Sequence, residues 1–184
     1  MDTLRPAPGE ITKLADIITH WAGKAPDRVA LTAGDRTWTY GQIDTEARQV
    51  AQGLIELGVG AGDRIAYLDR NTPEYFMHLF GGAKLNAVSV AVNWRLAPPE
   101  MEYIIDDADA KVLFVGEEFV GHLDRMNLPK VELVVVIGDP GGSGHHTVFV
   151  EQAVFERVAT GLGEQQGDDG RRVDDDHAGS PSSS

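Results

Sequence analysis

The sequence has 184 residues, of which 42% are hydrophobic and 7% aromatic, enough apolar material for one folded domain with a buried core. Its formal net charge of −13 argues against a nucleic-acid partner and against attachment to anionic lipid by charge alone, since both need clustered Lys and Arg. Cysteine is absent, which excludes disulfides, thiolate metal sites and thiol nucleophiles.

The first residues contain no basic segment leading into an apolar run, so we expect no secretory signal. The longest apolar runs, such as residues 133–137, are too short to cross a bilayer. We therefore expect a cytoplasmic protein without a transmembrane segment, for which peripheral membrane contact stays open.

The first predicted elements are a helix and a hairpin. Apolar residues recur at helical spacing through residues 11–21, and Gly23 follows them as a stop signal. Residues 29–32 and 36–38 are β-prone and flank Ala33-Gly34-Asp35, a sequence typical of a hairpin turn.

The second predicted helix has the clearest start in the chain. Thr39 is a favourable N-cap, and Gln42 three residues later completes a capping box. Gly58 supplies a residue that tolerates the left-handed conformation at the end of the helix. The apolar stripe between these signals consists of Ile43, Ala47, Val50, Leu54 and Leu57.

From residue 64 onward, short strands alternate with helices. The strands are predicted at residues 64–68, 88–92, 111–115 and 133–137, and the helices at 73–85, 98–107 and, more weakly, 118–126. Such alternation requires crossover connections. The predicted fold class is therefore α/β, with a three-layer arrangement of a largely parallel sheet and helices on both faces.

The C-terminal part has a different composition. Residues 138–144 are rich in Gly and are predicted to form a loop, and one last helix is predicted within 148–161. Residues 163–184 contain no Leu, Ile, Met or Phe, so we expect disorder there. The predicted domains are a flexible lead-in at 1–10, an α/β domain at 11–161 and a disordered tail at 162–184.

Two glycine clusters were considered as phosphate loops. The cluster at residues 58–62 follows a helix and precedes a strand, the reverse of a dinucleotide loop, so it is predicted to be a helix cap and turn. Gly141, Gly142 and Gly144 follow a strand, but no Lys comes next, which favours an ordinary loop.

Other catalytic and metal-binding patterns are equally weak. The histidines lack the spacing of a zinc enzyme, and no nucleophile elbow surrounds a serine. Asp106-Asp107 and Asp174-Asp175-Asp176 are predicted to be solvated charge runs rather than an acid–base pair. The six histidines are His20, His78, His122, His145, His146 and His177.

Asn93 and Arg95 are the polar residues best placed to touch a ligand, because they follow the strand at 88–92 and ligands of α/β sheets collect at strand carboxyl ends. The alternative, which we favour, is that both side chains brace their loop by bonding backbone carbonyls.

An ordered series of motifs over about residues 10–140 resembles the opening of the AMP-dependent synthetase and ligase family, and within it the fatty-acyl-CoA synthetases. No single motif is decisive, but their order is specific. The residues are Trp38-Thr39-Tyr40-Gly41-Gln42-Ile43, Gly58-Val59-Gly60-Ala61-Gly62-Asp63-Arg64-Ile65-Ala66, Asn71-Thr72-Pro73-Glu74-Tyr75, Ala83-Lys84-Leu85-Asn86-Ala87-Val88, Val92-Asn93-Trp94-Arg95-Leu96, Glu100, Tyr103-Ile104 and Lys111-Val112-Leu113-Phe114-Val115.

The resemblance implies two half-reactions. ATP and a carboxylate give an acyl-adenylate, and CoA then displaces AMP to form a thioester. The family's phosphate loop, approximately Thr-Ser-Gly-Thr-Thr-Gly-x-Pro-Lys-Gly, and its later catalytic motifs do not occur in this sequence. The family's ATP, Mg²⁺ and CoA sites therefore cannot be carried over, and no catalytic, cofactor-binding or metal residue is assigned at any position.

We therefore expect a fragment or truncated member of the family, arising from a frameshift or early stop, that is inactive alone. Two alternatives remain open. The chain is completed by a complementary chain, or it is a non-catalytic binding module that holds an acyl group or pairs with an intact synthetase.

Overall fold

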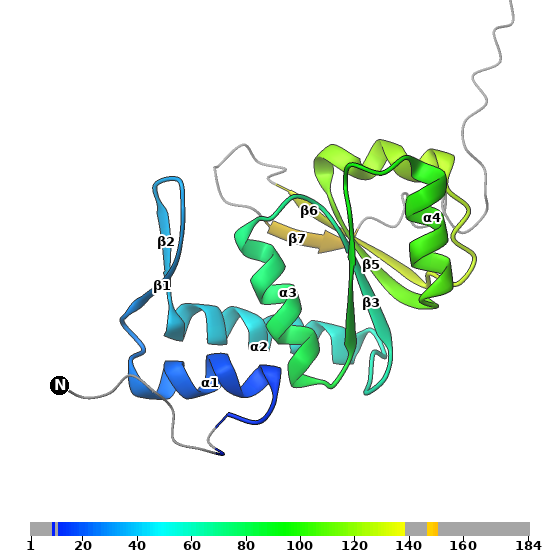
Figure 1. The fold of residues 1–184 in the computed structure, drawn as a ribbon. Helices are drawn as coiled ribbons and strands as arrows, with labels where there is room; N and C mark the ends of the chain where they lie inside the picture. Colours follow the sequence, from blue (N-terminus) through cyan, green and yellow to red (C-terminus); the bar gives the residue numbers. More distant parts are fainter. Residues whose placement is uncertain (1–8, 10, 139–146, 151–184) are drawn as a thin grey trace, which may run out of the picture.

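The structure is a computed structural model that describes residue 9, residues 11–138 and residues 147–150. Figure 1 shows a two-stranded hairpin standing apart from a larger sheet flanked by helices. In chain order the elements are α1 (Leu14–Lys24), β1 (Val29–Ala33), β2 (Arg36–Thr39), α2 (Tyr40–Glu56), β3 (Arg64–Leu68), α3 (Pro73–Lys84), β4 (Val88–Val92), α4 (Pro98–Asp107), β5 (Ala110–Gly116), the 3₁₀ helix η1 (Glu117–Arg125), β6 (Leu133–Gly138) and β7 (Thr147–Val150).

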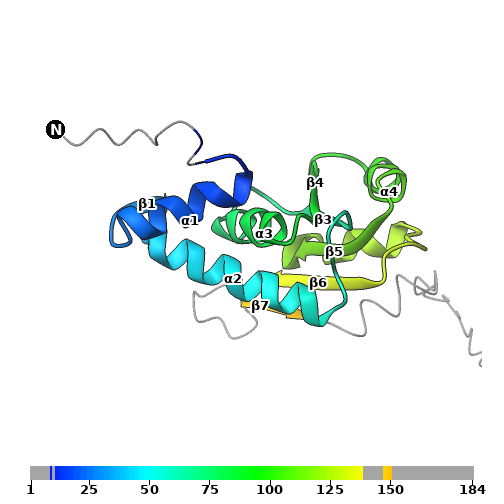
Figure 2. The same cartoon turned by 90° about the horizontal axis from the view of Figure 1, so that it is seen from below.

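The larger sheet has the strand order β4-β3-β5-β6-β7. The first four strands are parallel, and β7 adds to β6 in the antiparallel direction. Helices α2 and α3 cover one face, while α4 and η1 cover the other (Figures 1 and 2). The predicted three-layer α/β fold with a largely parallel sheet is confirmed.

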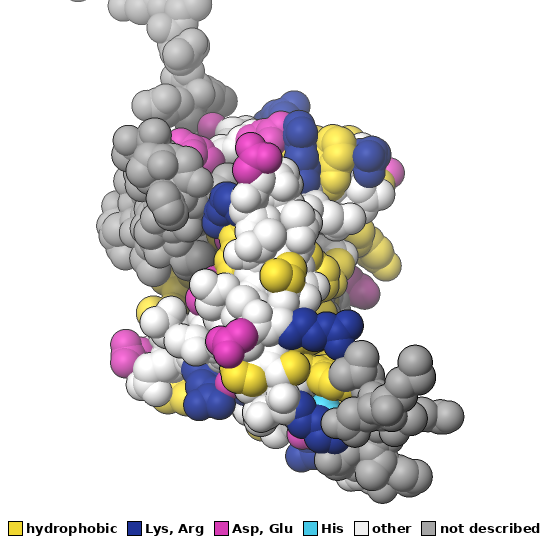
Figure 3. All heavy atoms as spheres, turned by 90° about the vertical axis from the view of Figure 1, so that its left-hand side faces the viewer, with side chains coloured by type: hydrophobic (Ala, Val, Ile, Leu, Met, Phe, Trp, Pro, Cys, Tyr) yellow, Lys and Arg dark blue, Asp and Glu magenta, His cyan; other side chains and the backbone are white. Residues whose placement is uncertain are grey.

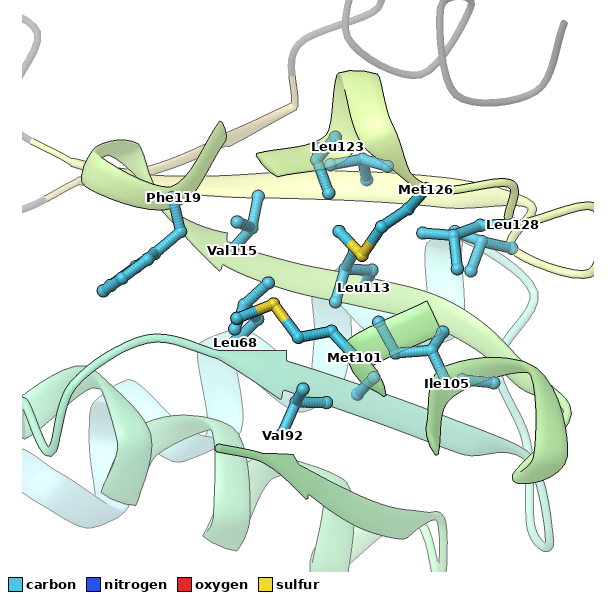
Figure 4. Close-up of a cluster of buried hydrophobic side chains, with 14 of the residues drawn as sticks. Leu68, Val92, Met101, Ile105, Leu113, Val115, Phe119, Leu123, Met126 and Leu128 are labelled. Atoms are coloured by element: carbon cyan, nitrogen blue, oxygen red, sulfur yellow. The ribbon is translucent and has the colours of Figure 1, made fainter. Parts of the chain in front are cut away.

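Alternate strand residues build two separate cores, because successive side chains of a strand point to opposite faces. Ile65, Val112 and Phe114 pack beneath α2 with Leu54. On the opposite face, Leu68, Leu113 and Val115 meet Met101 and Ile105 of α4 together with Phe119 and Leu123 of η1 (Figure 4). This division makes the sheet the central layer.

A third cluster joins the N-terminal elements to α3. Ile18, Trp38, Ile43 and Met77 share it, one residue from each of α1, β2, α2 and α3. Beside it the Asp44 carboxylate, 3% exposed, accepts a hydrogen bond of 2.7 Å from Lys84 Nζ. The N-terminal helices and hairpin are therefore fixed to the sheet domain through α3.

The predicted capping box of α2 is confirmed. Gln42 N donates to Thr39 Oγ1 at 3.2 Å, and Thr39 N donates to Gln42 Oε1 at 2.8 Å. Gly58 has a φ of 75°, as expected for the residue that ends this helix. Both signals are local, so they could be read without knowledge of tertiary packing.

Two helix predictions need correction. The first helix begins at Leu14 rather than residue 11, because the Asp16 carboxylate accepts from Thr12 N and Lys13 N and sets the helix start there. The weak helix predicted at 118–126 is a 3₁₀ helix, with Gly121 at its centre opposing regular α-helix.

The predicted helix at 148–161 is wrong at its start, since residues 147–150 form the strand β7. Backbone pairing with β6 makes this stretch a strand. The rest of that helix, the lead-in at 1–10 apart from Gly9, the loop after Gly138 and the tail lie outside the described residues. In the described ranges, no helix combines the length and apolarity that a bilayer span requires.

Candidate functional site

A cavity of about 820 Å³ lies between the β1–β2 hairpin, α2, α3 and the α2-covered face of the sheet. Its deepest side chains are apolar and at most 5% exposed. Polar side chains, among them Arg36, Glu46 and Glu74, line it as well. The apolar wall consists of Leu54, Met77, Phe114, Val135 and Ile137.

His78 lies in the wall of this cavity and is 1% exposed. Its Nε2 lies 2.7 Å from Ser89 Oγ, and its ring contacts Tyr67 and Phe114 at centroid distances of 5.0 and 4.8 Å. Burial lowers the pKa of His78 to about 3, so the imidazole is neutral near pH 7. Its Nδ1 is buried without a hydrogen-bond partner in the described part of the chain.

Glu74 lies one helical turn before His78 on α3, which brings both side chains to the same face. Its Oε1 is 3.8 Å from Arg36 Nη2, an ion pair too long for a hydrogen bond, and its Oε2 is buried without a partner among the described residues. Burial, and then the nearby Glu74 charge, raise the pKa of Glu46. Glu74 thus pairs with Arg36, whose positive charge also partly offsets the rise in the Glu46 pKa.

Figure 3 shows the side of the molecule that carries α1 and the hairpin. Acidic, basic and hydrophobic side chains are interspersed there rather than gathered into one patch of a single sign.

A second polar cluster lies where the parallel strands β3, β4 and β5 end. The Trp94 ring lies 4.1 Å from the Arg95 guanidinium carbon and 5.1 Å from that of Arg70, and Arg70 also pairs with Glu118. Phe119 contacts the same indole at a centroid distance of 5.9 Å. Two guanidinium groups on one indole suit recognition of an anionic group rather than acid–base chemistry.

The two side chains predicted at this end of the sheet have different roles. Asn93 Oδ1 accepts from Arg95 N at 3.1 Å, so Asn93 braces the loop, through a backbone N–H rather than the expected carbonyl. The Arg95 guanidinium stacks on Trp94 instead of bonding the backbone. Of these two side chains, Arg95 remains the candidate ligand-binding group.

The glycine cluster at residues 58–62 is the predicted cap and turn. Gly58 and Gly62 have φ values of 75° and 85°, and Gly60 N donates to Asp63 Oδ2 at 2.8 Å. The turn thus connects α2 to β3 with its own carboxylate partner.

The prediction of a solvated charge run at Asp106 and Asp107 fits the exposure of the Asp106 side chain, which is 40% accessible. Its carboxylate lies 3.3 Å from Lys130 Nζ and carries an oxygen, Oδ1, that is buried without a hydrogen-bond partner within the described ranges.

Of the histidines, His145, His146 and His177 lie outside the described residues, as do Gly141, Gly142, Gly144 and the acidic run at 174–176. His122 contacts Phe119 at a centroid distance of 5.7 Å. Across the portion that the structure describes, no three His, Asp or Glu side chains are grouped so that they could hold a metal ion.

The cavity around His78 was missed in the sequence. The signal was the spacing of Glu74 and His78, four residues apart in a helix and therefore on one face. Their convergence with Glu46 and Arg36 depends on the packing of α3 against α2 and the hairpin, which no local pattern contains.

The layered fold and the site can now be set beside known proteins. Residues 18–175 match the family model described as AMP-binding enzyme, and the chain belongs to this family. These residues represent the N-terminal region of an adenylate-forming ligase. The resemblance drawn from the ordered motifs is therefore confirmed.

Three individual similarities define the extent of the match. The fatty acid–[acyl-carrier-protein] ligase ScoC of Streptomyces coeruleorubidus is 34% identical over 71% of this chain and 25% of its own length. The crystal structure of the anthranilate CoA ligase AuaEII with anthranoyl-AMP has a TM-score of 0.66 at 37% identity, covering 70% of this chain and 25% of that one. The N-terminal domain of FACL13 from Mycobacterium tuberculosis has a TM-score of 0.60 at 32% identity, covering 62% of this chain and 30% of that one.

The chain thus spans about a quarter of the length of ScoC. The named relatives include a ligase of a fatty acid and a ligase of an aromatic acid. The comparisons therefore define the family of this chain but not the acid that is its substrate.

Proposed function

We propose that this chain is the N-terminal part of an AMP-forming ligase that activates a fatty acid, and that these 184 residues do not perform adenylation alone. The family sequence and the family fold occur over the same stretch, and this observation supports the ligase part of the proposal. The fatty-acid part is supported by the similarity to ScoC, a fatty acid ligase. The reaction of the complete family members joins a carboxylate to AMP before thioester formation.

ATP and Mg²⁺ supply the leaving group and the charge neutralisation that activate a carboxylate. The cavity residues do not fit a triphosphate, because Glu46 and Glu74 would repel it and a neutral His78 adds no positive charge. We assign no adenylation step to them. Arg70, Arg95 and Trp94 are better suited to an anionic group, but they include no side chain that could act as nucleophile.

ATP–pyrophosphate exchange on the purified chain tests the proposed lack of independent activity. With decanoate, anthranilate or no acid, and with Mg²⁺ present, we expect no exchange and no heat of ATP binding in isothermal titration. Acid-dependent exchange from the chain alone would show that a complete adenylation site is present and would overturn the proposal.

A chimera tests the positive half of the proposal. The stretch of ScoC that aligns with this chain is replaced by residues 11–138, which include all three cores. We expect fatty-acid-dependent exchange from the soluble chimera. A folded, soluble chimera without exchange would refute the proposed role, and exchange that prefers anthranilate would replace the fatty acid by an aromatic acid.

A second candidate is a non-catalytic binding module, and the cavity at His78 is the observation that favours it. A module of this kind is expected to be a monodisperse monomer, whereas the N-terminal part of a ligase exposes surface that the remainder of the enzyme covers. Analytical ultracentrifugation of the purified chain over a range of concentrations separates the two.

A further inference from the structure

The strand β4 lies at an edge of the sheet and lacks the usual protection of an edge strand. Among the described strands it pairs with β3 alone, and it lies between α3 and α4 (Figure 2). Natural edge strands are commonly blunted by Lys, Pro or a β-bulge. β4 contains no Lys or Pro, its register against β3 is regular, and no charged residue occurs between Lys84 and Arg95. The strand can therefore pair with a further chain.

The backbone hydrogen bonds show which groups of β4 are open. Val88 N donates to Asp63 O at 2.8 Å, so the backbone of Val88 faces β3. Because successive residues of a strand direct their backbone groups to opposite sides, those of Ser89 and Ala91 face away from β3. Within the described ranges, neither of these two residues has a backbone hydrogen bond to a turn or loop.

The open stretch is short, because the chain itself closes it at both ends. Before it, Ala87 N donates to Gly82 O at 3.0 Å. After it, Asn93 O accepts from Leu96 N at 3.1 Å. A partner strand therefore has only residues 89–91 to bond, which restricts its register.

The sequence of this stretch matches an antiparallel copy of itself. If two copies pair about a twofold axis at Val90, Ser89 of one copy lies opposite Ala91 of the other, and each of these residues donates one hydrogen bond and accepts one. Val88 then lies opposite Val92 of the other copy, and the two Val90 side chains meet at the axis. Every cross-strand pair thus joins two valines or two small residues, and none contains a charge.

The side chains of β4 leave room for such a contact. Val88 is 49% exposed, although Val90 and Val92 on the same face of the strand pack against the core beneath α4. Ala91 is exposed on the opposite face. We propose that the β4 edge is a self-association surface, at which two copies of this chain join their sheets in antiparallel register about Val90.

This inference goes beyond the proposed function and does not depend on it. Nucleotide exchange and the chimera report the ligase role, whereas the experiments below report the dimer. Because the dimer would obscure the monomer expected of a binding module, the ultracentrifugation that tests that alternative is made on the Ala91→Pro variant described below.

Sedimentation equilibrium of the full chain at pH 7 tests for the dimer. Each copy has a formal net charge of −13, so charge repulsion opposes an association that rests on backbone hydrogen bonds and apolar side chains. We therefore expect a reversible monomer–dimer equilibrium whose dissociation constant falls about threefold or more when NaCl is raised from about 50 to about 500 mM. A monomer at every concentration up to about 1 mM, or growth beyond the dimer, would overturn the proposal.

A single introduced thiol reports the register, because the chain has no cysteine. Val90→Cys places two thiols face to face in a non-hydrogen-bonded pair, with Cα atoms about 4.5 Å apart, which is within the range of disulfides. Val88→Cys is the matched control, since it lies on the same face and is more exposed, but its two copies are about 13 Å apart along the strands. Mild oxidation is expected to cross-link Val90→Cys at least about tenfold faster. Equal rates would contradict the proposed register.

Variants at Ala91 separate strand pairing from a general charge effect. Ala91→Pro removes an outward N–H without removing a bond to β3 and is expected to raise the dissociation constant at least about tenfold, while Ala91→Ser, the matched control, stays within about twofold. Ala91→Lys is also expected to weaken the dimer about tenfold, because the two ammonium groups lie diagonally across the axis. A dimer that survives Ala91→Pro, or that Ala91→Lys strengthens by reducing the net negative charge, would show that β4 is not the interface.

Discussion

Replacing Gly81 with Ala is expected to destabilise the protein, although Ala is the better helix former. Gly81 lies in α3, where the added methyl group would meet Val50 Cγ1 at 2.7 Å, Val50 Cβ at 2.9 Å and the Ala47 carbonyl oxygen at 3.0 Å. Real side chains almost never approach so closely. The α2 and α3 backbones therefore pack together with no room for a side chain between them.

The magnitude follows from two opposing effects. Overpacking a core typically costs about 1–3 kcal/mol, and the upper end applies because two of the three contacted atoms are Val50 Cβ and a backbone oxygen, which cannot rotate away. The gain in helix propensity on replacing Gly with Ala is about 1 kcal/mol. The net destabilisation is thus about 2 kcal/mol, or a fall in Tm of about 4–8 °C for a chain of this size.

Gly53→Ala is the matched control. Gly53 lies in α2, and a methyl group there meets no atom within 4 Å, so only the propensity gain of about 0.5–1 kcal/mol remains. Urea unfolding of both variants measures the difference. A Gly81→Ala protein as stable as the wild type would refute the close approach of α2 and α3 at this position. The same conclusion would follow if a Val50→Ala/Gly81→Ala double variant lost as much stability as the two single variants together.

Three further predictions concern single side chains. Burial opposes ionisation of Asp44, but the hydrogen bond and the charge of Lys84 outweigh burial and hold the pKa of Asp44 below its usual value. The stability that this carboxylate contributes is therefore present above about pH 4 and is lost as the pH falls through the folded-state pKa. Asp44→Asn should cost on the order of 2 kcal/mol in urea unfolding at pH 7 and less at pH 3. Because the pKa of His78 is lowered to about 3, we expect the free energy of unfolding to decline as the pH falls from about 6.5 toward 3. The His78→Leu variant should flatten this pH dependence. An unchanged slope of stability against pH would contradict the lowered pKa. Thr39→Ala should remove the hydrogen bond to Gln42 N and cost about 1 kcal/mol in thermal unfolding.

The elements that could be predicted from sequence are those defined by local chemistry. Thr39, Gln42 and Gly58 mark the two ends of α2 by side-chain and backbone preferences that do not depend on the rest of the molecule. The apolar strand at Arg64–Leu68 was equally clear, because a strand buried on both faces is nearly all hydrophobic.

The features that could not be predicted depend on distant contacts. β7 is a strand because β6 offers it a backbone partner, and the side chains of four residues cannot reveal that partner. The cavity likewise needs α3 to carry Glu74 and His78 against elements some thirty residues earlier in the chain. Arg95 was correctly expected at the strand end, but its stacking on Trp94 could not be inferred from position alone.

The position of β3 in the sheet has a consequence for synthesis on the ribosome. β3 lies between β4 and β5, and both follow it in the chain. When Leu68 has emerged, the strand has no neighbour to pair with, and the cluster of Ile18, Trp38 and Ile43 still lacks Met77. The nascent polypeptide therefore exposes apolar surface, to which chaperones would bind, until β4, β5 and their helices have been made.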